Sequence, residues 1–204
     1  MLARLLFAVL LCCLAASAGA YAAPAGRAAQ NPADRLSAQP IDDYSYDHAR
    51  GCRKRPTPGA LALVEWLERN AAGVSWGIMR CERWGKNKAS LHAEGRAVDW
   101  HLDAARPAER REANRLIELL LAADSAGNPH ALARRMGIQE IIWNCRSWWS
   151  GSERMDRYSP CFTEKGRPRK GVNRTTAHRD HIHFGLSRAG ARKRTSFWRP
   201  RRAG

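Results

Sequence analysis

The stretch Ser90-Leu-His-Ala-Glu-Gly-Arg-Ala-Val-Asp-Trp-His101 sets a histidine, His92, and a carboxylate, Asp99, seven residues apart around a glycine. From Ala97 its residues alternate in polarity, and alternate side chains of a β-strand point to opposite faces. Near the other end of the chain, the segment 180–184 alternates histidines with apolar residues and has the same strand pattern. Helical patterns stand between the two segments. We therefore predict an α+β domain with a small antiparallel or mixed sheet that is flanked by helices and carries both motifs.

Side chains from these two motifs form a ligand set for zinc: His92, Asp99 and His183. A catalytic zinc takes about three protein ligands and keeps another position open for a water, whose pKa it lowers. Two neutral imidazoles and one carboxylate leave such a site with a net positive charge, so the ion still acts as a Lewis acid. Gly95 lets the backbone turn between the first two ligands. The sequence predicts a Zn²⁺ site, and we expect no small-molecule organic cofactor.

A hydrolytic metal site also needs a general base within hydrogen-bond reach of the attacking water. Asp180 and His181 are the candidate catalytic residues. Strand alternation places His181 on the same face as His183, whereas it turns Asp180 away unless the strand begins after that residue. His101 shares a face with Asp99, and we interpret it as a neighbour that tunes the site.

Substrate contacts are predicted at Arg80 and Ser90, which lie on the approach to the first motif. The guanidinium of Arg80 or of Arg83 would stabilise the oxyanion of a tetrahedral intermediate. Ser90 would contact substrate or fix the turn before His92. Tryptophan in a small domain is usually packed, although some of the later tryptophans would line a cleft, namely Trp143, Trp148 and Trp149.

Residues 1–22 have the pattern of a secretory signal peptide, with a basic start, an apolar run and a small-residue cleavage site. Residues 23–45 read as a flexible lead-in, 46–198 as one domain that carries both motifs, and 199–204 as a basic tail. The formal net charge of +16 predicts an anionic partner. For an exported chain, in the periplasm or outside the cell, that partner is peptidoglycan or another anionic envelope polymer rather than nucleic acid. We expect a monomer.

Four cysteines remain after removal of the signal peptide, which favours two disulfides in an exported chain. Three pairings are open in principle. Their proximity and order in the sequence suggest Cys52 with Cys81 and Cys145 with Cys161.

Local signals predict the remaining elements. Thr57 and Pro58 start a helix that ends near residues 70–73, and Pro107 opens the longest helix, since proline is favoured at the first helical position. We expect a further helix at 128–135, strands at 74–80 and 138–143, and an irregular excursion between Cys145 and Cys161.

The pattern Ser90-x-His92-x-x-Gly95-x-Ala97-x-Asp99 resembles the first motif of the zinc peptidases of the D-alanyl-D-alanine carboxypeptidase and L-alanyl-D-glutamate endopeptidase superfamily. That superfamily includes lysostaphin-type enzymes and the hedgehog signalling domain. The chain also resembles extensin-like C-terminal domains and, over most of 44–198, secreted bacterial proteins of this group.

The resemblance implies that His92, Asp99 and His183 occupy the zinc-ligand positions. The carboxypeptidase branch has its catalytic acidic residue at the position of Asp180, whereas the lysostaphin-like branch uses the pair His181 and His183. In the carboxypeptidase branch a tryptophan stands where this chain has an isoleucine.

We therefore expect an exported zinc metallopeptidase that hydrolyses an amide bond in peptidoglycan peptides, with metal-bound water as nucleophile. The alternative is a non-catalytic envelope-binding module that retains the metal site. A third hypothesis is a charge-driven binder of anionic polymers or nucleic acid, whose affinity would fall steeply with salt.

Overall fold

The computed structural model describes residues 39–43, 45–85 and 88–199. The predicted signal peptide (1–22), most of the lead-in and residues 200–204 of the basic tail lie outside the described residues. Within the described ranges, no helix is both long and apolar enough to cross a membrane.

A six-stranded sheet forms the centre of the domain, with strand order β1-β4-β8-β5-β6-β7. Every pair of neighbouring strands runs antiparallel. The predicted α+β class with an antiparallel sheet is therefore confirmed. In order across the sheet, the strands are Val74–Gly77, Ala97–His101, His181–Leu186, Ile138–Trp143, Arg146–Trp149 and Asp156–Arg157.

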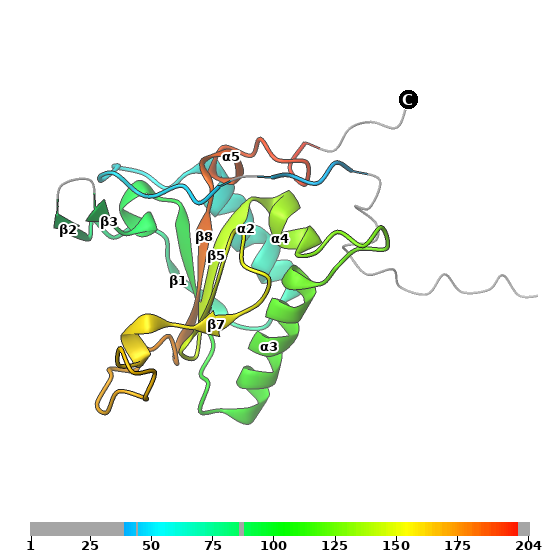
Figure 1. Cartoon of the computed structure of the whole chain (residues 1–204). Coiled ribbons are helices and arrows are strands. Elements are labelled where there is room, and N and C mark those ends of the chain that lie inside the picture. Colours follow the sequence, from blue (N-terminus) through cyan, green and yellow to red (C-terminus); the bar gives the residue numbers. More distant parts are fainter. Residues whose placement is uncertain (1–38, 44, 86–87, 200–204) are drawn as a thin grey trace, which may run out of the picture.

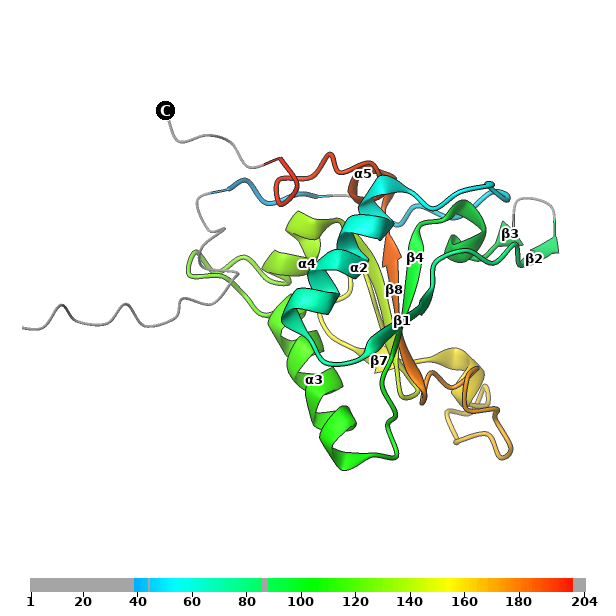
Figure 2. The ribbon, with the colours of Figure 1, turned by 180° about the vertical axis from the view of Figure 1, so that it is seen from behind.

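Helices cover one face of this sheet, as the opposite views in Figures 1 and 2 show. They are α2 (Pro58–Asn70), α3 (Pro107–Leu121) and α4 (Ala131–Met136), while the short α5 (Arg188–Ala191) follows β8. The starts of α2 and α3 were predicted from their prolines. The Thr57 hydroxyl accepts a hydrogen bond from the amide of Ala60 and so caps α2.

Alternation along the strands separates an apolar face from a polar one. Val98, Trp100, Ile182 and Phe184 have no exposed surface and pack in the core beneath the helices. Their neighbours along β4 and β8 point to the other face, as the period of two predicts. The polar face carries the candidate ligands.

Small elements frame the polar face. The 3₁₀ helix η1 (Leu91–Glu94) precedes β4, and the antiparallel pair β2 (Arg83–Gly85) and β3 (Lys88–Ala89) lies between β1 and η1 in the chain. A second 3₁₀ helix, η2 (Ser159–Cys161), follows β7. The strand expected over 74–80 ends at Gly77.

The predicted irregular excursion after Cys145 is wrong at its start, where β6 pairs with β5. The turn between these strands consists of Asn144 (φ 45°) and Cys145 (φ 62°), both left-handed. A two-residue hairpin turn requires this conformation, but it is usually marked by a glycine that is absent here. The hairpin therefore lacked its usual sequence signal.

Residues 39–43, within the predicted lead-in, contact the domain surface. The carbonyl of Gln39 accepts hydrogen bonds from Arg135, and Asp42 accepts hydrogen bonds from the amide and hydroxyl of Ser196.

Two disulfides join Cys52 to Cys81 and Cys145 to Cys161, which is the pairing suggested by their order. The first ties the segment before α2 to the segment that leads into η1. The second ties the β5–β6 turn to η2. Disulfides fit a chain that folds in an oxidising compartment.

Candidate metal centre

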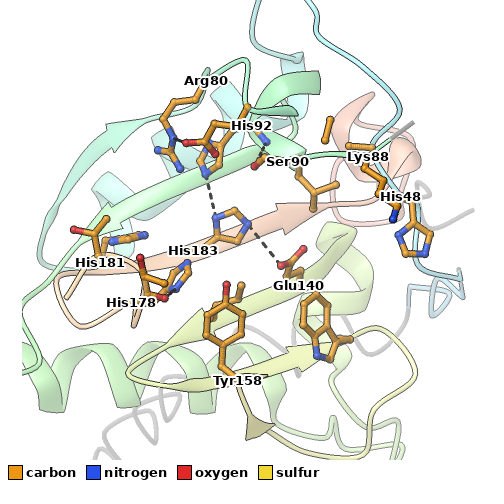
Figure 3. A pocket seen from close by; sticks show the side chains of 18 of the residues that line it. His48, Arg80, Lys88, Ser90, His92, Glu140, Tyr158, His178, His181 and His183 are labelled. Carbon is orange, nitrogen blue, oxygen red and sulfur yellow. Dashed lines mark hydrogen bonds and ion pairs between the residues drawn. The ribbon is translucent and has the colours of Figure 1, made fainter. Parts of the chain in front are cut away.

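Ligand atoms from three separate elements converge on the polar face of the sheet. His92 Nε2 lies 3.0 Å from Asp99 Oδ1 and 3.1 Å from His183 Nδ1, and the third side of this triangle, from His183 Nδ1 to Asp99 Oδ1, is 3.1 Å. All three residues are buried. The fold thus brings together the three residues predicted as metal ligands, and Figure 3 labels two of them, His92 and His183.

The position of His92 is set by the short helix η1. Ser90 caps this helix by accepting a hydrogen bond from the His92 amide. Gly95 ends it at φ 65°, where an added Cβ would stand 2.7 Å from the carbonyl oxygen of Arg55, so a side chain is excluded for two reasons. The helix therefore delivers His92 to the start of β4 in one orientation.

The tautomer of His92 follows from its second ring nitrogen. Nδ1 lies 2.8 Å from the carbonyl oxygen of Ile78, which can only accept a hydrogen bond. The proton of the neutral ring is therefore on Nδ1, and the lone pair of Nε2 faces Asp99 and His183. Backbone carbonyls orient metal-binding histidines in this way.

Asp99 and His183 face each other directly in the β4–β8 register, which fixes their separation. While Asp99 Oδ1 belongs to the ligand triangle, Oδ2 accepts a hydrogen bond from Arg80 Nη1 at 2.5 Å. Arg80, which we predicted to bind substrate, thus also holds one oxygen of the carboxylate. Its Nε pairs with Glu82.

Burial and charge shift the pKa values of the cluster. Burial alone raises the pKa of Asp99, but the adjacent imidazoles of His183 and His92 outweigh it and hold that pKa well below its usual range. Burial lowers the pKa of His92. Although burial also lowers the pKa of His183, its hydrogen bond to Asp99 and the nearby charge of Glu140 raise it overall.

This set of atoms fits a divalent cation. It offers two imidazole nitrogens and one carboxylate oxygen, the N and O ligands that zinc binds in catalytic sites. The three atoms are far closer together than buried acceptors are without a donor or cation between them. Nothing in the geometry distinguishes zinc from other ions that accept imidazole and carboxylate ligands.

Both candidate bases lie beside the cluster. Strand β8 begins at His181, so the alternation of side chains along the strand does not determine where Asp180 points. Asp180 Oδ1 lies 2.7 Å from His181 Nδ1. The other ring nitrogen of His181, Nε2, lies 3.6 Å from Asp99 Oδ1. Asp180 Oδ2 accepts a hydrogen bond from the Thr175 hydroxyl. His101, predicted to be a neighbour, lies 2.7 Å through Nδ1 from the Asp180 carbonyl oxygen.

The cluster opens into a cleft of about 1190 Å³. Arg80, Ser90, His92, His181 and His183 all contribute to its walls. Of the three tryptophans considered earlier, Trp149 lines the cleft, while Trp143 and Trp148 are buried in the core.

Sequence reasoning missed His178, which also lines the cleft. It has a left-handed backbone (φ 50°), and its ring centre lies 4.6 Å from that of His181. Burial and the neighbouring histidines lower its pKa to about 3, so the ring is neutral near pH 7. The signal was present as three histidines among six residues, 178–183, but the motif that we identified began at Asp180.

Three further lining residues were missed, namely Tyr46, Glu140 and Tyr158. Nothing in the local sequence marks them, because Tyr46 and Glu140 are 94 residues apart and meet only in the fold.

The model of one protein family, the VldE C-terminal domain, matches residues 52–170. The matched range contains His92 and Asp99 and ends before His181 and His183. This match neither supports nor conflicts with the resemblance to zinc peptidases. No curated protein and no solved structure matches the chain.

Proposed function

The chain belongs to the VldE C-terminal domain family, whose model matches residues 52–170 of 204, and we propose that it is an exported zinc-dependent hydrolase. Its proposed substrate is an amide bond in peptidoglycan peptides. The observation that carries the proposal is the triangle of ligand atoms from His92, Asp99 and His183, which has the His181–Asp180 pair beside it in an open cleft.

A zinc ion held by His92, Asp99 and His183 would supply Lewis acidity, activating a water and polarising a carbonyl group. The residues around it divide the remaining work. His181 accepts the proton of the attacking water at Nε2. Asp180, 2.7 Å from Nδ1 of the same ring, orients the imidazole and stabilises its charged form.

Arg80 and His178, which line the cleft, have two further roles. Arg80 fixes Asp99 through Oδ2 and leaves Oδ1 toward the ligand triangle. The Nδ1 of His178 lies 3.1 Å from the Thr176 carbonyl oxygen, so its proton is on Nδ1 and its Nε2 is an acceptor for a substrate N–H. A neutral ring can accept this hydrogen bond at physiological pH.

The choice of peptidoglycan rests on independent features. The motif around His92 and Asp99 resembles that of peptidases acting on this polymer. The disulfides and the signal-like N-terminus suit an exported chain. The cleft, at about 1190 Å³, exceeds the usual range of about 300–1,000 Å³ for small-molecule sites and suits an oligopeptide.

The first experiment measures metal content by elemental analysis and digestion of purified muropeptides by the same preparation. We expect about one zinc per chain and cleavage of one amide bond. Asp99→Ala should lose the metal and the activity together. The hydrolase proposal fails if the zinc-loaded protein leaves every muropeptide amide intact while a known amidase digests the same sample.

A second variant tests whether His181 acts as a general base or as a metal ligand. His181→Gln should retain zinc and lose kcat by about 10²-fold or more, the range for a general base. The matched control is His130→Gln, since His130 lies outside the cleft and contacts the Glu153 carbonyl. Both activity and metal content should be unchanged in this control.

One observation favours the alternative of a non-catalytic binding module that retains the metal. The 3.6 Å between His181 Nε2 and Asp99 Oδ1 would let His181 act as a fourth ligand and close the coordination shell. Structural zinc sites have such a closed shell. Loss of zinc in His181→Gln, together with intact muropeptides for the wild-type protein, would establish this alternative.

A further inference from the structure

Glu140 is a buried carboxylate on the polar face of β5, beside the candidate metal centre. Its side chain is only 8% exposed. Oε2 accepts a hydrogen bond of 2.5 Å from the Tyr46 hydroxyl, while Oε1 lies 3.9 Å from His183 Nε2, too far for a hydrogen bond. In the described part of the chain, no lysine or arginine forms an ion pair with it. Its negative charge is therefore only partly compensated.

A glycine in the neighbouring strand β8 leaves space around the Glu140 carboxylate. Glu140 is opposite Gly185 in the β5–β8 register. A Cβ on Gly185 would lie 3.2 Å from Glu140 Oε2 and 2.4 Å from a methyl group of Leu91, so any larger residue there would crowd the carboxylate. The glycine therefore leaves room for the Glu140 side chain.

Aromatic rings surround Glu140 on its other sides. Trp149 is its partner in the β5–β6 register, and the ring centres of Tyr46 and Trp149 lie 5.5 Å apart. Tyr158 stands near Glu140 in the view of Figure 3, and its pKa is raised by burial and by the charge of Glu140. These rings are partly exposed and line the cleft together with Glu140.

A buried carboxylate bordered by aromatic rings recognises organic cations. Burial of an unpaired charge is costly, so a cationic group that reaches Glu140 gains a strong ion pair. Ring faces add cation–π attraction, which is strongest where water is excluded. We propose that Glu140, Tyr46, Trp149 and Tyr158 form a subsite for a primary ammonium group of the substrate. This inference rests on the proposed function and narrows its substrate class to peptides that carry a free amine.

The position of the subsite sets where the amine must be. Glu140 lies next to His183, on the β5 side of the ligand triangle, whereas the arginine at the triangle, Arg80, lies on the β4 side. A substrate with an amine toward β5 and a carboxylate toward Arg80 would match both charges of the cleft.

The test compares two peptidoglycan stem peptides that differ only in one amine, free in the first and acetylated in the second. Their binding to chelator-treated protein is measured by calorimetry, so that no turnover can occur. We expect the free amine to bind at least about tenfold more tightly, the contribution of a charged hydrogen bond. Glu140→Gln should abolish this preference and leave zinc content unchanged. Glu118→Gln, on the exposed surface of α3, is the matched control.

Each outcome decides one claim. Equal binding of both peptides, or a preference that survives Glu140→Gln, overturns the subsite. Loss of zinc in Glu140→Gln also overturns it, because Glu140 would then act by orienting His183. If Glu140→Gln does not fold, Trp149→Leu takes its place and should reduce the preference about two- to fivefold; an unchanged preference there overturns the subsite. Absence of cleavage by zinc-loaded protein, with the preference retained, removes the hydrolase proposal alone.

Discussion

Two buried clusters in this domain are each built around a carboxylate. The groups that contact the carboxylate differ between the two clusters. In one, Asp124 Oδ2 accepts a hydrogen bond of 2.8 Å from the guanidinium of Arg135, and Oδ1 accepts hydrogen bonds from the amides of Ala126 and Asn128. In the other, Asp99 Oδ1 faces the ring nitrogens of His92 and His183. The first carboxylate has donors at both oxygens, whereas the second has a donor, Arg80, at Oδ2 and groups able to bind a cation at Oδ1.

The difference distinguishes a structural cluster from a binding site. Both Asp124 and Asp99 have a lowered pKa, although burial alone would raise it. At Asp124 the chain supplies the compensating charge through Arg135, whose side chain is 1% exposed. At Asp99 the guanidinium of Arg80 pairs with Oδ2, while Oδ1 faces imidazole nitrogens that are able to bind a cation. We expect the first cluster to matter for folding and the second for ion binding.

The largest predicted effect is the loss of stability when Asp124 loses its partner Arg135. Arg135→Met leaves Asp124 as an uncompensated buried charge, which costs about 3–5 kcal/mol of unfolding free energy. Urea unfolding measures this loss. Metal content of the folded fraction should be unchanged, since Arg135 belongs to the other cluster.

The double variant Arg135→Met with Asp124→Leu serves as the control. It removes both charges and should recover much of the lost stability, because buried ion pairs add little relative to apolar residues of similar size. A single variant as stable as wild type would contradict the structural role assigned to this cluster.

The second cluster should respond to ions instead. At a free zinc concentration about 100 times Kd, the unfolding free energy should rise by about 2.7 kcal/mol through mass action. Asp99→Ala should show no such rise. Thermal unfolding with and without zinc, each in a chelator-controlled buffer, measures the difference. A rise of equal size in Asp99→Ala would place the ion elsewhere.

The fold was predictable where its signals were local. The two strands β4 and β8 follow from alternation, and the starts of α2 and α3 follow from their prolines. The hairpin at Asn144 and Cys145 was not predictable, because residues other than glycine adopt its left-handed turn. The strand order, with β8 between β4 and β5, depends on long-range pairing that leaves no local pattern.

The site, like the fold, was predictable only where its signals were local. Its candidate ligands His92, Asp99 and His183 lie in short motifs that local spacing identifies, and the fold brings them together. Glu140 was not predictable, since its setting depends on Gly185 in one neighbouring strand and on Tyr46 from a distant segment. Residues that act through long-range contacts cannot be identified from local spacing.

Acid should affect the structural cluster in a defined range. Hydrogen bonds from Asn128 and Arg135 lower the pKa of Asp124 from 3.8 to about 2, although burial opposes this. Because the folded pKa is lowered, this group contributes stability above about pH 3.8, and the contribution is lost as the pH falls toward about 2. For one group the slope cannot exceed about 1.4 kcal/mol per pH unit. Urea unfolding of wild type and Asp124→Asn across this range measures it as the difference in slope; identical slopes would contradict it.

The smallest effect concerns a single neutral donor in the same cluster. Asn128 Nδ2 lies 3.1 Å from both oxygens of Asp124, and the Asn128 amide also donates to Oδ1. Asn128→Ala removes only the side-chain donor, so we expect a loss of about 1–2 kcal/mol, the range for a hydrogen bond to a charged group. Arg135 still compensates the charge, which is why this loss should be well below that of Arg135→Met. An equal loss in the two variants would mean that geometry, rather than charge, holds the cluster together.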